Sequence, residues 1–136
     1  MNAVDTNVLA RFFINDEDDS EAAKQRPAAI SALTGAVFVP VTVILEFEWV
    51  MRGFYELSRN DIQRIFESLC GLENVQIEDR NIVLEALKSY QQGLDFADAL
   101  HLARAHFCSQ FYSFDQRMKK RVEAAGISPA VVIPTA

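Results

Sequence analysis

The sequence is poor in the residues that build several common kinds of functional site. It contains two cysteines and two histidines among 136 residues, and they do not have the spacing of a zinc site. It contains five glycines and no glycine-rich loop of the kind that cradles nucleotide phosphates. These scarcities argue against a zinc centre, a disulfide-rich secreted domain and a nucleoside triphosphatase.

Long hydrophobic runs are also missing. The longest strongly apolar stretch, residues 36–45, is interrupted by Pro40 and Thr42 and is too short to cross a bilayer. The first residues, MNAVDTN, lack the basic and then apolar pattern of a secretory signal. We therefore expect a cytoplasmic protein without membrane segments, in which Cys70 and Cys108 are buried free thiols.

The length and the charge balance narrow the class of protein further. A chain of 136 residues is typical of one domain, here expected over residues 1–136, and it buries enough surface to fold without disulfides. Acidic residues outnumber basic ones by 19 to 13, so the formal net charge is −6. This excludes a general basic coat for nucleic acid, and contact with phosphate would need a divalent cation or a local basic cluster.

Hydrophobic periodicity and capping residues predict short strands that alternate with helices. Strands are expected at residues 2–5, 37–39, 75–77, 110–114 and 131–133. Helices are expected at residues 8–14, 20–34, 43–53, 58–70, 79–92, 95–106 and 115–125. Strands separated by one or two helices predict an α/β protein with a parallel sheet and helices on both of its faces.

Several local expectations accompany this pattern. Thr6 or Asn7 is expected to cap the first helix and Thr42 the helix at 43–53, while Pro27 is expected to kink or split the helix around it. Glu48 is expected at the surface. The aromatic residues of the first half are expected mostly in the core, with any surplus available to a partner: Phe12, Phe13, Phe47, Trp49, Phe54, Tyr55 and Phe66.

Four acidic residues stand where a parallel α/β sheet collects ligands, near strand ends and helix starts. Asp5 ends the first strand and Asp115 follows the fourth, while Glu46 and Asp98 lie near the starts of apolar helices. Carboxylates that converge without Lys or Arg repel one another, and Mg²⁺ or Mn²⁺ relieves that repulsion. Such a cluster is typical of metal-assisted phosphodiester hydrolysis, although each acid also has a purely structural interpretation as a cap, turn or core residue.

At these acids the sequence resembles a known family. The segments VDTNVL (4–9), LEFEWV (45–50), DFADALH (95–101) and FD (114–115) look like the four signatures of the PIN domain, and most like those of the VapC toxins of bacterial toxin–antitoxin pairs. Each signature is weak alone, but their order and settings together are specific. The resemblance implies a three-layer α/β/α sandwich around a mostly parallel sheet.

The resemblance also implies an activity and a metal site. It implies an endoribonuclease that depends on Mg²⁺ or Mn²⁺ and leaves 5′-phosphate and 3′-hydroxyl ends. Asp5 and Asp98 would be the firmest ligands, Asp115 would complete the site, and Glu46 would bind directly or through water.

Further residues and partners follow from the same resemblance. Asn7 would orient Asp5, and Ser113 would hold a water or a carboxylate near Asp115. The implied partners are an RNA substrate, a second copy of the chain in a homodimer, and an antitoxin whose tail wraps the toxin.

Basic residues near the acids are candidates for RNA phosphate contacts, although a solvated helix would also carry them. They are Arg11, Arg117, Lys119, Lys120 and Arg121. Other classes of protein remain as alternatives. A phosphotransferase with a strand-end aspartate nucleophile would need a second aspartate where Asn7 stands. A non-catalytic PIN-like or receiver-like module that binds a metal or a partner stays open.

Overall fold

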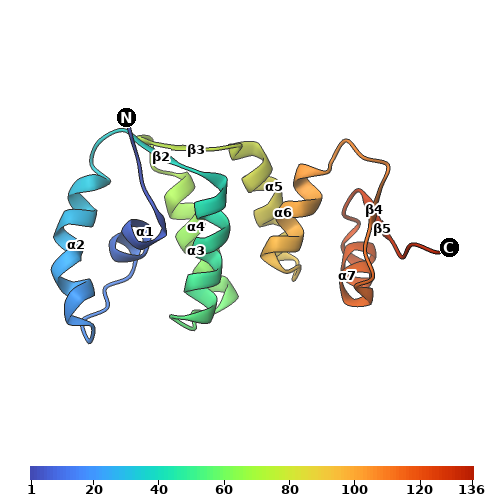
Figure 1. Ribbon diagram of the computed structural model, residues 1–136, viewed down its shortest axis with the longest axis horizontal. Coiled ribbons are helices and arrows are strands. Elements are labelled where there is room, and N and C mark those ends of the chain that lie inside the picture. Colours follow the sequence, from blue (N-terminus) through green and yellow to red (C-terminus); the bar gives the residue numbers. More distant parts are fainter. The chain divides into compact units, whose positions relative to one another are not determined.

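The computed structural model describes residues 1–136 throughout (Figure 1). The chain divides into two units, Met1–Glu78 and Asp79–Ala136, and the elements of each unit pack among themselves. Each unit combines a small parallel sheet with helices, so the α/β class predicted from the sequence is confirmed. None of the helices combines the length and the apolar character that crossing a membrane requires.

The sheet of the first unit has three parallel strands in the order β1-β2-β3: β1 (Asn2–Ala3), β2 (Val37–Val39) and β3 (Val75–Ile77). Val37 pairs with Val75 and Val39 with Ile77, and all four side chains are buried. Gln76, between two buried residues, is exposed. This alternation follows from the two-residue repeat of a strand, which turns successive side chains to opposite faces.

Four helices complete the first unit: α1 (Thr6–Phe13), α2 (Ser20–Ala32), α3 (Val41–Gly53) and α4 (Arg59–Cys70). α1 packs against α2 and α3, and α3 packs against α4. The rings of Phe47 on α3 and Phe66 on α4 meet edge to face, with centroids 5.8 Å apart, and both are fully buried. Apolar residues three and four positions apart supply this core, as the helical period requires.

The second unit contains α5 (Arg80–Gln91), α6 (Phe96–Arg104), β4 (Gln110–Tyr112), α7 (Gln116–Ala125) and β5 (Ala130–Val132). α5 and α6 pack closely, with Tyr90 and Phe96 edge to face at 5.5 Å. β4 and β5 pair in parallel, and α7 packs on β5. α7 ends at Gly126, whose φ of 66° is a conformation that favours glycine.

All twelve elements expected from the sequence are present, but two predicted caps are wrong. Asp5, rather than Thr6 or Asn7, caps α1. Pro40, rather than Thr42, holds the cap position of α3 and offers no side-chain acceptor. Glu78 Oε1 instead accepts a hydrogen bond from the Val41 backbone N–H at 2.8 Å. Pro27 lies inside a continuous α2 and does not split it.

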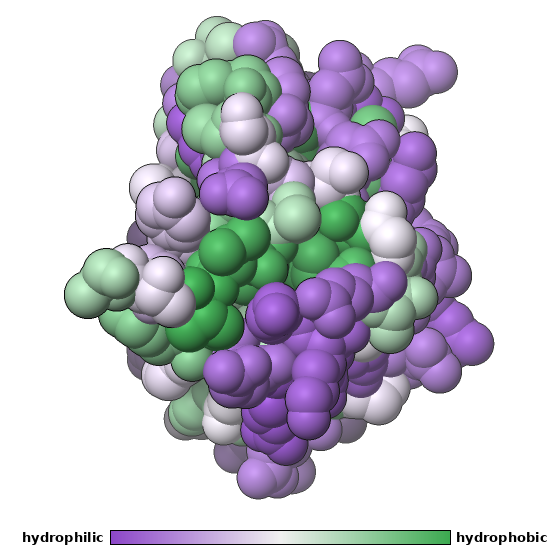
Figure 2. Space-filling view, turned by 90° about the vertical axis from the view of Figure 1, so that its right-hand side faces the viewer, coloured by the Kyte–Doolittle hydropathy of each residue, from purple (hydrophilic) through white to green (hydrophobic).

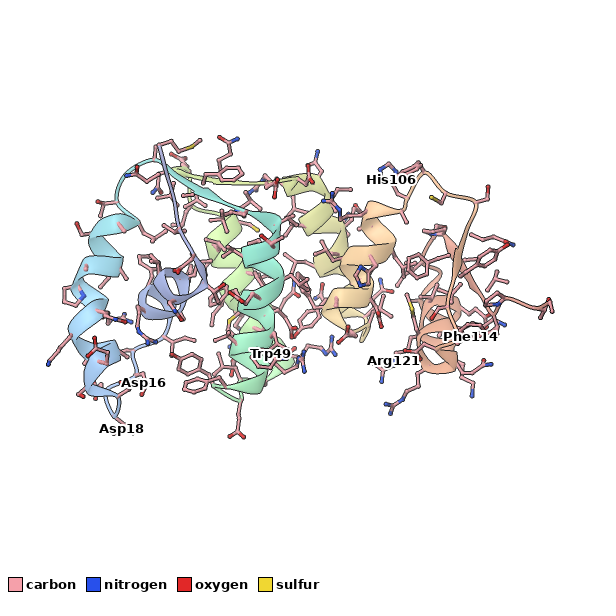
Figure 3. The ribbon with its side chains drawn as sticks, viewed as in Figure 1. Asp16, Asp18, Trp49, His106, Phe114 and Arg121 are labelled. Carbon is pink, nitrogen blue, oxygen red and sulfur yellow. The ribbon has the colours of Figure 1, made fainter.

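Several burial expectations also need correction. Glu48 is buried, at 2% exposure, because it forms an ion pair with Arg52 one turn later, at 2.9 Å. Trp49 (labelled in Figure 3) and Phe54 are exposed, at 60% and 67%, and so belong to the surplus and not to the core. Cys70 is a buried free thiol as expected, whereas Cys108 is a free thiol outside the helices and exposed.

The remote cap of α3 leads to a stability prediction. Glu78→Ala should lower the free energy of unfolding by about 1 kcal/mol, because the Val41 N–H loses its acceptor. Urea unfolding followed by circular dichroism measures this. Glu73→Ala is the matched control, because Glu73 is exposed and makes no side-chain hydrogen bond. Equal stabilities of the two variants would contradict the capping role.

Candidate active site

Asp5 lies two residues after β1, where the strand gives way to α1. Its Oδ1 accepts a hydrogen bond from the Val8 backbone N–H at 3.1 Å, which makes it the N-cap of the helix. The side chain is exposed, and its second oxygen has no protein donor. The carboxylate is therefore held in place through one oxygen while the other stays available.

Glu46 is linked to the same helix start. It lies in the second turn of α3, which begins just after β2, and β1 and β2 run parallel. Thr6, the first residue of α1, donates its hydroxyl hydrogen to Glu46 Oε1 across 40 positions of sequence. The first unit thus brings Glu46 to the residue that follows Asp5.

Asp115 repeats the Asp5 arrangement in the second unit. It lies three residues after the end of β4 and caps α7, with its Oδ1 accepting from the Met118 N–H at 3.0 Å. Ser113 Oγ accepts from the Asp115 backbone N–H, also at 3.0 Å. Ser113 therefore supports the backbone of Asp115, and the role that the resemblance implies for it, holding a water or a carboxylate, stays a prediction.

Asp98 lies in the first turn of α6. Asp95 is the N-cap of this helix, and its side chain accepts a hydrogen bond from the Asp98 backbone N–H at 3.2 Å. The side chain of Asp98 is half-buried and makes no hydrogen bond. Partial burial raises the pKa of Asp98, and repulsion from Asp95 and Asp115 raises it further, against a smaller lowering by His101. The second unit thus brings Asp98 within the electrostatic influence of Asp115.

The four predicted acids are therefore found as two pairs, one in each unit, and each acid keeps at least one oxygen without a protein donor. No group of three or more His, Cys, Asp or Glu side chains stands together in an arrangement that would hold a metal ion. The donor chemistry of both pairs is the same, since all are carboxylates, the hard ligands that Mg²⁺ and Mn²⁺ prefer.

Some of the predicted basic side chains bind other residues of the protein, and others do not. Arg11 donates to the Tyr55 hydroxyl at 2.9 Å and to Gln25 at 3.0 Å, so it links α1 to other parts of the first unit. On α7, Lys119 pairs with Glu123 at 3.6 Å and Arg121 donates to the Gly93 carbonyl. The exposed Arg117 and Lys120 make no such contacts, so they remain free to meet a phosphate.

The unit that carries Arg117 and Lys120 also has apolar surface. Figure 2 looks onto the side that carries α7, β4 and β5, and it shows an apolar patch bordered by hydrophilic residues. Three aromatic side chains of this unit are strongly exposed: Phe107, Tyr112 and Phe114. Phe114 (labelled in Figure 3) directly precedes Asp115. Exposed aromatic area of this kind is typical of interaction surfaces.

The sequence analysis missed the role of Thr6 at this site. Asn7, which the resemblance gave as the partner of Asp5, is exposed and makes no side-chain hydrogen bond. Thr6, considered only as a cap, instead contacts Glu46. The available signal was that Thr6 lies on the apolar, buried side of the first helix, where a hydroxyl needs a partner.

Comparison with known proteins identifies the class. The PIN domain family model matches residues 3–123, which cover most of both units. The VapC ribonuclease of Aquifex aeolicus (strain VF5) is 31% identical over 124 residues, 88% of this chain and 91% of that protein. No solved structure matches the chain significantly.

The chain therefore belongs to the PIN domain family, in which it is of the VapC type. Membership carries the three-layer α/β/α fold class that the resemblance implied. It is consistent with strand pairings that are all parallel.

The raised pKa of Asp98 predicts how the metal-free protein responds to pH. A carboxylate whose pKa is higher in the folded than in the unfolded chain destabilises the fold when it is ionised. Asp98→Asn should therefore raise the free energy of unfolding at pH 7 by less than about 1 kcal/mol, since the group is only half-buried.

That gain should disappear as the pH falls through the raised pKa of Asp98 toward its usual value of 3.8. Thermal unfolding in chelator, measured from pH 7 to pH 4, tests this. Asp18→Asn is the control, because Asp18 is exposed in the loop between α1 and α2 (Figure 3). A gain that is the same at both ends of the pH range would contradict the electrostatic cause.

Proposed function

We propose that this protein is a metal-dependent endoribonuclease of the VapC type and the toxin of a toxin–antitoxin pair. The observation that carries the proposal is the coincidence of two findings. The PIN domain match spans residues 3–123, and the similar protein from Aquifex aeolicus is a VapC ribonuclease. At the four acids of the PIN signatures, the chain holds carboxylates with an uncommitted oxygen.

The donor set fits Mg²⁺ or Mn²⁺. Asp98 is the clearest case, because burial and then repulsion from Asp95 and Asp115 raise its pKa, and a bound cation would offset both effects. We propose that Asp5, Asp98, Asp115 and Glu46 serve one cation-dependent reaction. We also propose that residues 1–136 act as a single PIN-like domain.

A divalent cation held by these acids would supply positive charge near the scissile phosphate and would lower the pKa of a nucleophilic water molecule. The chain contributes the rest. Asp5 and Asp115 are kept in place by their caps, and Thr6 and Ser113 hold Glu46 and the Asp115 backbone. Arg117 and Lys120 attract the phosphate backbone of RNA.

The proposed partners are RNA, a cognate antitoxin protein and a second copy of the chain. The exposed Trp49 and Phe54 support a protein partner, because large aromatic side chains left in water are typical of binding surfaces. We place the activity in the cytoplasm, where such a toxin meets RNA.

Cleavage of RNA by the antitoxin-free protein tests the proposal. With Mg²⁺ or Mn²⁺, total cellular RNA should yield discrete fragments with 5′-phosphate ends, and a chelator should abolish them. Asp98→Asn and Asp115→Asn should each lower the cleavage rate more than about 100-fold, because changes outside the ligand set alone cost about 10–100-fold.

Asp18→Asn serves again as the control and should cut at the rate of the unaltered protein. Cation binding by a refolded, antitoxin-free protein that cuts no RNA would favour the non-catalytic binding module. Cleavage that persists in chelator would contradict the metal dependence.

Arg117 and Lys120, the exposed basic residues of α7 that make no hydrogen bond or ion pair within the protein, give a second prediction. The double variant Arg117→Gln, Lys120→Gln should raise the KM for RNA and leave kcat nearly unchanged, because both residues bind phosphate and neither takes part in the chemistry. The slope of log affinity against log salt should fall by roughly 0.7 for each lost contact.

Lys24→Gln is the matched control for this double variant, because Lys24 is an exposed lysine on α2 that has no ion pair. An unchanged salt slope in the α7 variant would exclude these residues from the RNA interface.

A further inference from the structure

Thr6 occupies an unusual place for a polar residue. It is 4% exposed, and Thr6 and Glu48 are the only buried polar or charged residues of the chain. A buried hydroxyl must find a hydrogen-bond partner, because otherwise it loses its contact with water without compensation. The partner of Thr6 is Glu46 Oε1, at the surface of α3.

The two glutamates of α3 are held in different ways. Glu48 pairs with Arg52, so its negative charge is compensated inside the first unit. Glu46 receives a neutral hydroxyl, which orients the carboxylate and leaves its charge uncompensated. A carboxylate that is oriented by a neutral donor and has no ion pair is open to a divalent cation, which prefers such oxygen ligands.

The place of Thr6 in the chain adds to this argument. It directly follows Asp5, and the first turn of α1 fixes the Asp5 carboxylate through its cap. The same turn therefore holds both candidate acids of the first unit, one through a backbone N–H and the other through the Thr6 hydroxyl. A glutamate side chain has several free rotations, and this contact restricts them.

We propose that Thr6 is a positioning residue, whose hydroxyl holds the Glu46 carboxylate in place for the divalent cation. The inference rests on the proposed function, because it assigns Thr6 to the cation site of that activity. It predicts a specific loss of cation affinity when the hydroxyl is removed and the shape of the side chain is kept.

Mn²⁺ binding to the full chain without RNA is the direct readout, measured by isothermal titration calorimetry. Thr6→Val, which replaces the hydroxyl with a methyl group, should weaken Mn²⁺ binding by about 10–100-fold. Thr6→Ser, which restores a hydroxyl, should return the affinity to within about threefold of the unaltered protein. The Mg²⁺ concentration for half-maximal RNA cleavage should move in parallel.

Thr42→Val is the matched control. Thr42 lies on α3 one turn before Glu46, is exposed, and makes no side-chain hydrogen bond. Its loss should leave Mn²⁺ affinity unchanged. Equal weakening by Thr42→Val and Thr6→Val would show a general effect of lost hydroxyls and would overturn the proposal.

Glu46→Asp keeps the test decisive if Thr6→Val does not fold. The shorter side chain retains the charge but withdraws it from Thr6, so Mn²⁺ binding should weaken to a similar extent. Where both single variants fold, the double variant should bind no more weakly than either, because both remove one contact.

Mn²⁺ affinity at the wild-type level in Thr6→Val, or in Glu46→Asp if that variant alone folds, would overturn this inference and leave the proposed function standing. A protein that binds no Mn²⁺ and cuts no RNA even with Thr6 intact would overturn both.

Discussion

A hydrogen bond from a backbone N–H to an aspartate carboxylate, made at the first turn of a helix, is the interaction on which this site depends. It holds Asp5 at the start of α1 and Asp115 at the start of α7. Both helices begin within a few residues of a strand's carboxyl end, so the turn of the chain and the position of the acid are set together. The helix dipole favours a negative charge at this end, so each carboxylate stands where its charge is stabilised.

The second constraint is the repulsion that such carboxylates exert on one another. Asp98 shows it most clearly, since it has no hydrogen-bond donor and lies in the field of two other aspartates. No neighbouring Lys or Arg forms an ion pair with Asp98 to offset this repulsion. Elsewhere the chain does form such ion pairs, between Glu48 and Arg52 and between Asp79 and Arg104. The difference separates acids whose charge is paired with a cationic side chain from Asp98, whose charge is not.

Local patterns predicted the fold well and its long-range contacts poorly. Every helix and strand was expected from periodicity, although the caps of α1 and α3 were not, and the PIN signatures in the sequence indicated the family. The cap of α3 by Glu78 could not be foreseen, because its donor and acceptor are 37 positions apart and only the pairing of β2 with β3 brings them together. The burial of Glu48 has a local cause, Arg52 one turn on, which the sequence offered and we did not use.

The candidate site divides along the same line. The four acids, and the caps by Asp95 and Asp115, were predictable because each depends on residues within a few positions. The contact of Thr6 with Glu46 was not, because it joins two helices through the packing of α1 on α3. The sequence shows that Arg11 lies close to Asp5, whereas its hydrogen bond to the Tyr55 hydroxyl depends on the tertiary structure.

The capping role of Asp5 and Asp115 also has a consequence for how mutation would abolish the proposed activity. Asparagine caps a helix about as well as aspartate, but its neutral amide is a poor substitute for a carboxylate at a cation. Under the proposed function, a single Asp-to-Asn change at either position would leave a folded chain that no longer cuts RNA. Such a chain would keep its surface for the proposed antitoxin, and so would act as a decoy that frees active copies of the same protein.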